Sequence, residues 1–574
     1  MSLAARVDRG DGRLRITAPA GNPAVLLADC APWARPRRRD GHLTLSSVEV
    51  LRLRSEGVPV ELDDDTARWL ANRSHVESAA AAVLAESRRI LESGGAAARE
   101  LIRDCSIADR LDDHQAVNVA AMVVPEGWGA CVFDEQGTGK TISVVGAFDT
   151  LVSRQEAETL LVVAPKSMIG EWAVEFRRFA GGLYEVAVAD GSRADRARAI
   201  NSGADVVVVN YETVGSLSDV LKLLAKRSKT VMVIDESFFV KNPDSRRTQS
   251  VRELREWCTR CFVLCGTPAP NAAHDLVAQV DLVDFGRTFG GVEIDKDRQV
   301  AQGQVRSILN DRGFYLRNLK SDVLPNLPER HFLEVSVEMS AVQRDVYDRL
   351  HDDLVLELQN TTDEAFSRHV VHFLERRALL LRICSDPAPV LDDYDETPVK
   401  IAALDSLLAD FIESRREKVV VWSFYRSSLD RIAQRYSSYG VARIDGSVTS
   451  SADRRDAVKS FQEDDETMLF LGNPAAAGAG LTLHRSRVAI YESLSNQAAH
   501  YLQSLDRIHR RGQNREVEYL HLLTTDSLER AEYQRLLDKA DTQADLLGDV
   551  GQDRVTRQML LEELLTDRTT SMRP

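Results

Sequence analysis

The chain has 574 residues, 44% of them hydrophobic, and a net charge of −15. A chain of this length exceeds a single hydrophobic core and should divide into about three or four domains. The negative net charge excludes a uniformly basic protein that coats nucleic acid. It does not exclude a local stripe of arginines inside a groove. No apolar run approaches the roughly 20 residues of a membrane-spanning helix, so a role in the membrane has no support.

The seven cysteines show no regular pairing, and the N-terminus lacks a long apolar export segment. Both features favour a reducing compartment, and we expect a cytoplasmic protein. Cys258, Cys261 and Cys265 have a spacing that invites a zinc site, but no second Cys or His pair lies nearby. We therefore predict reduced cysteines in the core.

Residues 1–107 are predicted to form an accessory domain that is first β-rich and then helical. Short alternating stretches among residues 1–60, separated by Gly and Pro, predict small strands. The basic cluster at 35–39 is either a solvated loop, the commoner case, or a contact to a phosphate backbone. Residues 65–105 have a helical period that should end near Gly94 and Gly95. This domain could contact a protein partner.

From about residue 108, apolar strands alternate with helices, which is typical of βαβ units and a parallel sheet. The expected strands, each nearly all apolar as a strand buried on both faces must be, lie at 130–133, 160–164, 205–209, 230–234 and 261–264. In such sheets ligands bind at the carboxyl ends of the strands. We predict an α/β lobe over residues 108–285.

The first of these strands leads into Gly-Thr-Gly-Lys-Thr at 137–141 and then into a segment compatible with a helix. Glycines let backbone N–H groups turn inward, and the following helix N-terminus adds positive potential, so the stretch can cradle a phosphate. Lys140 can reach the β- and γ-phosphates, and the Thr141 hydroxyl can hold Mg²⁺. The strict pattern has glycine where this chain has Asp134, so the pattern alone also fits an ordinary glycine-rich turn.

Asp235 and Glu236 directly follow the strand at 230–234 and should emerge at the sheet edge where the phosphate loop lies. We predict that Asp235 binds Mg²⁺, directly or through water, and that Glu236 polarises the attacking water. The alternative is a pair of acids that caps the next helix. The strand at 261–264 runs into a Gly/Pro turn in which Thr267 could couple hydrolysis to movement.

Residues 286–395 lose the strand alternation and are predicted to form a helical insertion, since such a length is too great for a loop. A second alternating region follows, a predicted lobe at 396–540 without a phosphate loop. Its expected strands lie at 418–422, 442–444, 467–471, 488–491 and 517–522. Residues 541–574 are predicted to be a helical tail that packs as a brace or, less often, binds a partner.

The second lobe contributes a conspicuous basic stretch. Arg507 and Arg510 are three residues apart, so on a helix they would share a face and could project across a cleft as arginine fingers that stabilise a transferring phosphoryl group. The alternative is an ordinary basic helix surface. The flanking Gln503 and Gln513 and the abrupt Gly512 favour the functional interpretation.

Together these residues resemble the Swi/Snf-like branch of the superfamily 2 helicase-related ATPases, of a bacterial or phage type, over about residues 108–530. The matching motifs, in the family's order, are the adenine-reading glutamine motif at 111–115, motif I at 134–141, motif Ia at 163–167, the Walker B box at 235–237, motif III at 266–268 with Asn271, the opening of the second lobe at 423–424 and 445–447, motif V at 477–483 and motif VI at 503–513. Two further segments, at 316–328 and 381–387, also resemble the family.

The resemblance implies an α/β fold with two RecA-like parallel-sheet lobes, a helical insertion and a small N-terminal α+β accessory domain. It implies ATP and Mg²⁺ as cofactors and a motor that tracks along double-stranded DNA. The catalytic residues that it implies are Lys140, Asp235, Glu236, Arg507 and Arg510. The nucleotide-binding residues would be Gln115, Gly137, Thr138, Gly139, Lys140, Thr141 and Gly480, with Thr141 and Asp235 holding Mg²⁺. The residues that couple hydrolysis to DNA would be Ser167, Thr267, Thr482 and Gln503.

Two departures from the family pattern bear on function. The fourth Walker B residue is usually His, but here it is Phe238, whose ring cannot donate a hydrogen bond to motif III, so the coupling of hydrolysis to DNA movement is in question. Residues 494–497 replace the usual Trp-Asn-Pro. We predict a DNA-stimulated ATPase that translocates on double-stranded DNA. The alternatives are a nucleotide-gated DNA-binding scaffold with a weak, uncoupled ATPase and a strand-separating helicase.

Overall fold

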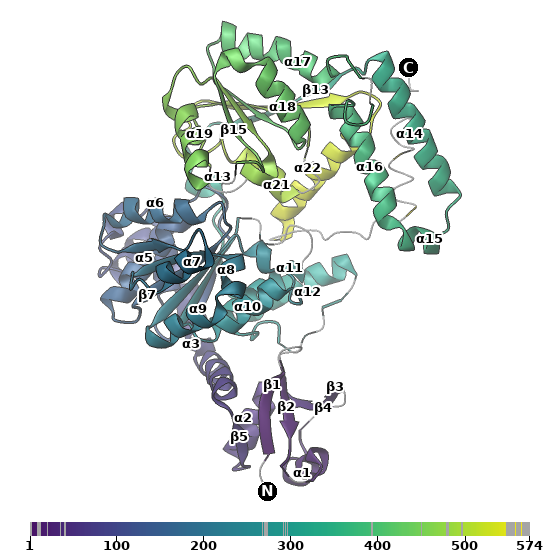
Figure 1. Cartoon of the computed structure of the whole chain (residues 1–574). Helices are drawn as coiled ribbons and strands as arrows, with labels where there is room; N and C mark the ends of the chain where they lie inside the picture. The colour runs from purple at the N-terminus through teal and green to yellow at the C-terminus, as the bar shows by residue number, and fades with distance from the viewer. Residues whose placement is uncertain are drawn as a thin grey trace.

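The computed structural model describes residues 3–546 except 9–12, 20, 35, 40–41, 267, 269–273, 291, 293, 296, 392–393, 449, 478–480 and 495–497, together with Arg557 and Leu564. Three β-sheets organise these residues. Figure 1 shows them as successive bodies, with a small N-terminal sheet at one end, lobe 1 in the middle and lobe 2 at the other end. Among the described helices, none combines the length and the apolar character needed to cross a membrane.

The N-terminal sheet has five strands in the order β3-β4-β2-β1-β5 and confirms the predicted β-rich unit. Its strands are β1 (Leu3–Asp8), β2 (Arg13–Thr17), β3 (Arg37–Arg39), β4 (His42–Leu45) and β5 (Val60–Leu62), and its helices are α1 (Pro23–Cys30) and α2 (Ser47–Ser55). Alternate residues such as Leu14, Ile16 and Leu45 are buried in one core with side chains from α1 and α2. The basic cluster predicted as a loop includes strand β3, while residue 35 lies outside the described residues.

Helix α3 (Asp64–Leu101) joins the N-terminal sheet to lobe 1. Its start packs Trp69 and Leu70 into the core of the N-terminal sheet, whereas the stretch from Val76 onward belongs to the core of lobe 1. Gly94 has φ 78° and interrupts the helix where an end was predicted, but the helix resumes beyond it. The accessory domain predicted to end at residue 107 therefore ends within α3, because the second half of this helix packs against α4 of lobe 1.

Lobe 1 is a seven-stranded, fully parallel sheet in the order β12-β6-β11-β10-β7-β9-β8. Its strands are β6 (Gly129–Val132), β7 (Thr159–Ala164), β8 (Val186–Val188), β9 (Val206–Asn210), β10 (Thr230–Asp235), β11 (Arg260–Leu264) and β12 (Tyr315–Leu316). Its helices are α4 (Asp113–Met122), α5 (Lys140–Ser153), α6 (Ile169–Ala180), α7 (Arg193–Ile200), α8 (Tyr211–Ser216), α9 (Ser218–Arg227), α10 (Arg246–Arg255), α11 (His274–Asp284), α12 (Arg298–Arg312) and α13 (Lys320–Val323).

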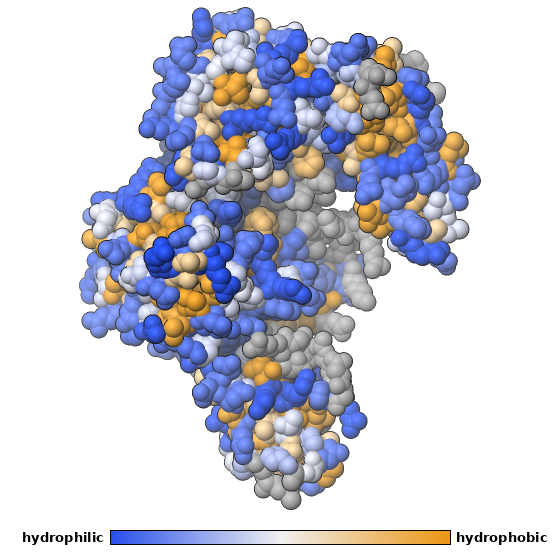
Figure 2. Space-filling model, in the orientation of Figure 1, coloured by the Kyte–Doolittle hydropathy of each residue, from blue (hydrophilic) through white to orange (hydrophobic). Residues whose placement is uncertain are grey.

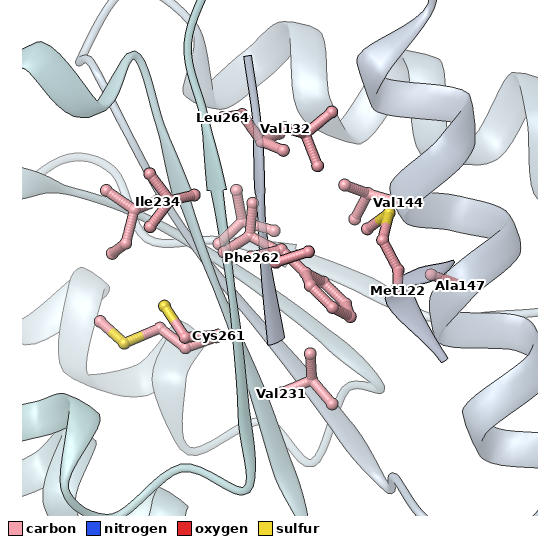
Figure 3. Close-up of a cluster of buried hydrophobic side chains, with 14 of the residues drawn as sticks. Met122, Val132, Val144, Ala147, Val231, Ile234, Cys261, Phe262 and Leu264 are labelled. Atoms are coloured by element: carbon pink, nitrogen blue, oxygen red, sulfur yellow. The ribbon is translucent and has the colours of Figure 1, made fainter. Parts of the chain in front are cut away.

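Both faces of this sheet are buried, as the continuous apolar strands predicted. Figure 3 shows Phe262 of β11 pointing toward Met122 and Ala147 on one side, while Cys261 points to the other. Successive strand residues alternate between faces, so a strand covered on both sides needs apolar residues at every position. The predicted placement of Cys261 in a buried strand is confirmed, and Cys258 is buried beside it.

The segment 286–395 differs from the predicted helical insertion because it supplies a strand to each lobe. β12 pairs with β6 at the edge of lobe 1, and β13 (Arg330–Val337) pairs in parallel with β18 of lobe 2. β12 is only two residues long, and β13 is exposed along most of its length at a sheet edge, so neither has the apolar run that identifies a strand. The rest forms α12, α13 and an arm of α14 (Ala341–Gln359), α15 (Asp363–Arg368) and α16 (Val370–Ser385) beside lobe 2 (Figure 1).

Lobe 2 is a six-stranded parallel sheet in the order β13-β18-β17-β14-β16-β15. The remaining strands are β14 (Val419–Trp422), β15 (Val441–Ile444), β16 (Leu469–Gly472), β17 (Val488–Tyr491) and β18 (Val517–Thr524), close to the predicted ranges. Its helices are α17 (Val399–Leu408), which continues as a π-helix over Ala409–Ser414, α18 (Arg426–Arg435), α19 (Ser451–Glu463), α20 (Pro474–Ala477), α21 (Ala498–Leu505) and α22 (Glu529–Leu546). Most of the predicted tail lies outside the described residues; Leu564 is buried against the arm.

A buried ion pair holds α17 onto this sheet. Lys400 donates from Nζ to Glu529 Oε1 at 2.6 Å and to the Glu492 carbonyl at 2.8 Å, and both side chains of the pair are almost fully buried. The other oxygen of Glu529 accepts hydrogen bonds from the backbone and side chain of Thr524. Each charge is thus satisfied inside the core, which is the condition under which a buried pair is tolerated.

Replacing Lys400 with Met should destabilise lobe 2 by about 3–5 kcal/mol, because the Glu529 carboxylate would stay buried without its cation. Arg435→Met is the matched control: its pair with Asp405 is exposed, with 42% and 41% of the two side chains accessible, and should cost less than about 1 kcal/mol. Urea unfolding followed by circular dichroism measures both. Equal losses in the two variants would contradict this account of lobe 2.

Candidate functional site

The predicted phosphate loop lies between β6 and α5 at the carboxyl edge of the lobe 1 sheet. Gly137 and Gly139 have φ of 86° and 98°, and α5 begins at Lys140. Lys140 donates from Nζ to the carbonyls of Asp134 at 2.8 Å and Glu135 at 3.1 Å. The ammonium group is therefore held across the loop at a helix N-terminus, where an anion is favoured.

Gln115, the predicted adenine-reading residue, supports this loop from α4. Its Nε2 donates to the Thr138 carbonyl at 2.9 Å, and its Oε1 accepts from the Asp112 N–H at 2.9 Å. The φ of Gly139 favours glycine, and a Cβ there would lie 2.2 Å from Gln115 Nε2, so a side chain would also have to displace that amide. Both ends of the Gln115 amide are thus committed to protein groups. The capping-box spacing of Asp112 and Gln115 signals the Oε1 contact alone and not the contact of Nε2 with Thr138.

Asp134, which replaces the glycine of the strict pattern, anchors the loop to two other elements. Its carboxylate accepts from Asn118 Nδ2 at 2.6 Å, from the Asn318 N–H at 2.8 Å and from Asn318 Nδ2 at 2.9 Å. The residue is 1% exposed. A buried carboxylate with three donors is fully satisfied, so Asp134 fixes the start of the loop between α4 and the segment after β12.

Asp235 and Glu236 lie where β10 ends, as predicted. Asp235 accepts from Trp172 Nε1 at 2.7 Å, and burial together with the Glu236 charge raises the pKa of Asp235 to about 7. Glu236 adopts the left-handed region, with φ 50° and ψ 57°, a strained conformation for a residue other than glycine. Its Oε1 accepts from Gln136 Nε2 at 2.8 Å, while Oε2 is buried without a hydrogen-bond partner among the described residues.

These oxygens fit a nucleotide-bound Mg²⁺. The ion prefers carboxylate and hydroxyl oxygens and keeps several waters and phosphate oxygens in its shell. Thr141 lies in the first turn of α5, and Asp235 ends a strand at the same edge of the sheet. The Oε2 of Glu236 is a buried acceptor for which the described residues provide no donor, so it can accept from a water molecule.

Arg507 and Arg510 differ from the predicted arrangement because they do not share a helix face. Helix α21 ends at Leu505, and both arginines lie in the turns that follow. They converge instead through the Leu481 carbonyl, which accepts from Arg507 Nη1 at 3.3 Å and from Arg510 Nη1 at 2.8 Å. Burial, and then the charge of Arg510, lower the pKa of Arg507 to about 9. The pair is a buried concentration of positive charge, which an anion would relieve.

The arginine turn lies against the phosphate loop of the other lobe. A Cβ built on Gly137 would be 3.8 Å from Arg510 Nε and 3.5 Å from Lys320 Cε. Lys320 bridges the two lobes: its N–H donates to Glu135 Oε2 at 2.7 Å, and its ammonium pairs with Asp506. The sequence indicated Lys320 only as part of the segment 316–328, which resembles the family. No local pattern indicates that this lysine meets an acid 186 residues away.

The Walker B box and motif III are joined through a residue that the sequence did not single out. Ser237 donates from Oγ to Gln279 Oε1 at 2.5 Å, and Gln279 Nε2 donates to the Pro268 carbonyl at 2.5 Å. Both Ser237 and Gln279 are fully buried. Phe238, which raised doubt about this connection, stacks on Phe239 with ring centroids 4.6 Å apart. The described connection from the Walker B box to motif III therefore starts at Ser237 and runs through Gln279.

The remaining predicted residues are placed as follows. Thr482 Oγ1 accepts from Arg510 Nη1 at 2.8 Å. Gln503 lies on α21 and is buried, and its Nε2 has no hydrogen-bond partner among the described residues. Ser167 lies in the turn after β7, at the same sheet edge as the phosphate loop. Thr267 and Gly480 fall outside the described residues, so their predicted roles stay predictions.

A phosphate loop, two carboxylates at the end of a parallel strand and arginines from a second parallel-sheet lobe define a two-lobed nucleotide-binding protein. The SNF2-related domain family matches residues 64–388, and the helicase conserved C-terminal domain family matches residues 399–512. The chain belongs to the SNF2-related family, which places it among the ATPases of helicase superfamily 2, as the motifs predicted.

Several known proteins are similar to the chain. It is 28% identical over 440 residues to the ISWI chromatin-remodeling complex ATPase ISW1 of Saccharomyces cerevisiae (71% of this chain, 37% of that protein) and 25% identical over 417 residues to an uncharacterized ATP-dependent helicase, MG018, of Mycoplasma genitalium (70% and 38%). The chain thus spans less than half the length of these relatives. Among solved structures, the Sulfolobus solfataricus SWI2/SNF2 ATPase core in complex with dsDNA aligns with a TM-score of 0.36 and 21% identity, covering 76% of this chain and 92% of that one.

Gly139→Ala should weaken ATP binding, because the new methyl group would displace the Gln115 amide from the Thr138 carbonyl and remove its support of the phosphate loop. Gly203→Ala is the matched control: its φ of 83° is also positive, but nothing lies within 4 Å of its Cβ position. Both variants carry backbone strain of roughly 1–3 kcal/mol, so they should lose similar stability. Titration with a fluorescent ATP analogue should show at least a tenfold loss of affinity in Gly139→Ala alone. Unchanged affinity there would refute the contact as the reason for glycine.

Proposed function

We propose that the chain is a DNA-stimulated ATPase that translocates along double-stranded DNA, using ATP and Mg²⁺. The observation that carries the proposal is the meeting of the lobes at the phosphate loop, where Arg510 of lobe 2 comes within 3.8 Å of the Cβ position on Gly137 of lobe 1. A nucleotide bound there would contact both lobes, so its hydrolysis would change their relative position.

Each residue would have a separate role in hydrolysis. Lys140 would leave the carbonyls of Asp134 and Glu135 and neutralise the β- and γ-phosphates. Thr141 and Asp235 would hold Mg²⁺, which when bound shields phosphate charge. Glu236 would orient the attacking water through Oε2, the oxygen that has no other hydrogen-bond partner among the described residues.

The arginines would complete the site from lobe 2. Arg507 and Arg510 are held by the Leu481 carbonyl, so they are positioned before the nucleotide arrives. The transferring phosphoryl group spreads negative charge over its oxygens, and a preorganised guanidinium pair stabilises that charge more in the transition state than in the ground state. Loss of the γ-phosphate would remove this attraction and allow the lobes to separate.

Duplex DNA as the track is supported by family membership and by the likeness to a relative named as a chromatin-remodeling ATPase. The two alternatives, a nucleotide-gated scaffold and a strand-separating helicase, make different predictions for hydrolysis and strand displacement. The Ser237–Gln279 link weakens the scaffold, since that hypothesis drew on Phe238 as a break between the Walker B box and motif III.

The test is steady-state ATP hydrolysis by the wild type and by Lys140→Ala, without nucleic acid and with matched duplex DNA, single-stranded DNA and RNA. Duplex DNA should raise the wild-type rate at least tenfold over the rate without nucleic acid, and Lys140→Ala should be inactive throughout, because it lacks the phosphate-binding ammonium. A wild-type rate indifferent to every nucleic acid would contradict the proposal and favour the scaffold. Separation of the strands of a blunt duplex would favour the helicase.

Gln279→Leu should uncouple hydrolysis from DNA, because it removes the amide that joins Ser237 to the Pro268 carbonyl while keeping a similar volume. Basal hydrolysis should stay within about twofold, and stimulation by duplex DNA should fall at least fivefold. Val277→Leu, a partly buried apolar position on the same helix, is the control for repacking. If stimulation survives in Gln279→Leu while thermal unfolding is unchanged, the Gln279 link is not part of coupling.

A further inference from the structure

Glu236 carries its charge away from water. Figure 2 shows hydrophilic residues over much of the surface of both lobes, where water can solvate their side chains. Glu236, by contrast, is 5% exposed. A carboxylate buried to this extent needs hydrogen-bond donors inside the protein. Among the described residues, only Gln136 provides one to this carboxylate: its Nε2 donates to Glu236 Oε1 at 2.8 Å.

The backbone of Glu236 is fixed by other groups. The Tyr211 hydroxyl donates to the Asp235 carbonyl at 2.6 Å and lies 3.4 Å from the Glu236 carbonyl. The Glu236 N–H donates to Asp235 Oδ1 at 3.0 Å. These contacts hold the strained backbone, but they leave the rotatable bonds of the Glu236 side chain free. The hydrogen bond from Gln136 to Oε1 therefore sets the place of Oε2.

The Gln136 side chain is itself held in place. Gln136 belongs to the phosphate loop and is followed by Gly137, whose φ is 86°. Gly266 of motif III packs against its side chain, since a Cβ built on Gly266 would lie 2.8 Å from Gln136 Cγ and 3.1 Å from Nε2. Motif III follows β11, and the Cys265 N–H donates to the Val132 carbonyl of the neighbouring strand at 3.1 Å. Gln136 thus connects the phosphate loop, the Walker B box and motif III.

Two cations act on the acids at this sheet edge and could compete for the Glu236 carboxylate. Burial lowers the pKa of Arg507, and the negative charge of Glu236 opposes that change. Burial raises the pKa of Asp235, and the positive charge of Lys140 opposes that rise. A carboxylate that could turn freely would pair with such a cation, because ionised donors bind carboxylates more strongly than neutral ones. Gln136 restrains the carboxylate with a neutral amide.

We propose that Gln136 is a positioning residue for ATP hydrolysis, which holds Glu236 through Oε1 and thereby keeps Oε2 available to the attacking water. The arrangement is that of a catalytic group oriented by a third side chain. The inference rests on the proposed function, because that function assigns the attacking water to Glu236. Gln136 would act on the chemical step, whereas ATP binding would depend on Lys140 and the loop backbone.

The experiment measures single-turnover ATP hydrolysis and the affinity for a fluorescent ATP analogue in the wild type and in Gln136→Met. Methionine has a similar length and volume but no hydrogen-bond donor. Hydrolysis by Gln136→Met should be at least tenfold slower, because a misplacement of about 1 Å at a reacting centre can cost about 100-fold. Its affinity for the analogue should stay within about twofold of the wild type, since only the chemical step is affected.

Gln304→Met is the matched control. Gln304 is also a half-buried glutamine of lobe 1, and its Oε1 accepts from the Asp295 N–H at 2.9 Å. It lies on α12, outside the phosphate loop, the Walker B box and motif III. This variant loses one hydrogen bond of a glutamine, as Gln136→Met does, but it should hydrolyse ATP at the wild-type rate.

A double-mutant cycle tests whether Gln136 acts through Glu236. In the Glu236→Gln background, adding Gln136→Met should slow hydrolysis by less than about twofold, because the carboxylate that Gln136 positions is already absent. Two effects that multiply would show that Gln136 acts on another group and would overturn the inference.

Four further results are decisive. If Gln136→Met hydrolyses ATP as the wild type does, or if its only defect is weaker nucleotide binding, Gln136 is not a positioning residue. If the wild type hydrolyses no ATP with or without duplex DNA, the proposed function fails and this inference fails with it. A wild-type rate indifferent to DNA, with Gln136→Met still at least tenfold slower, would contradict the translocase and support the positioning role. If Gln136→Met unfolds, Gly266→Ala replaces it, because its methyl group would displace the Gln136 side chain, and a wild-type rate there would overturn the inference.

Discussion

The buried carboxylate of Asp134 is the constraint on which the site depends. It accepts hydrogen bonds from Asn118 and Asn318, so the phosphate loop is anchored on two sides independently of any ligand. The Lys140 ammonium binds carbonyls of the loop, and Gln115 binds the Thr138 carbonyl beside Gly139. A loop fixed in this way loses little conformational entropy when a nucleotide binds, which preserves binding energy for the chemistry.

The same anchor connects the loop to lobe 2. Asn318 is two residues from Lys320, whose backbone binds Glu135 and whose ammonium pairs with Asp506, next to Arg507. A shift of the loop would therefore reach the arginine turn through one short segment. On the opposite side, Glu236 is followed by Ser237, which reaches motif III through Gln279. These two routes are candidates for coupling ATP hydrolysis to movement of the lobes. In each route the groups are joined by hydrogen bonds and are not merely close to one another.

The strands of both lobes could be predicted because they are buried on both faces, so β7, β9, β10 and β14 read as unbroken apolar runs. Strand β13 could not be predicted in this way, because it lies at a sheet edge and most of its residues are exposed. The phosphate loop and the acids of β10 were predicted in place because their residue types follow strand ends. Two contacts were not predicted: the hydrogen bond from Gln115 Nε2 to the Thr138 carbonyl and the one from Gln279 Nε2 to the Pro268 carbonyl. Both partners are backbone carbonyls, and the residue type does not indicate which distant carbonyl a side-chain amide will meet.

Displacement of a third strand from a triplex tests the central claim most directly, because it reports movement along the duplex separately from hydrolysis. With ATP, the wild type should release a third strand placed downstream of a duplex loading site, and Lys140→Ala should release none above the spontaneous rate. Wild-type protein that hydrolyses ATP faster on duplex DNA, yet leaves the third strand bound, would contradict the account of a translocating motor.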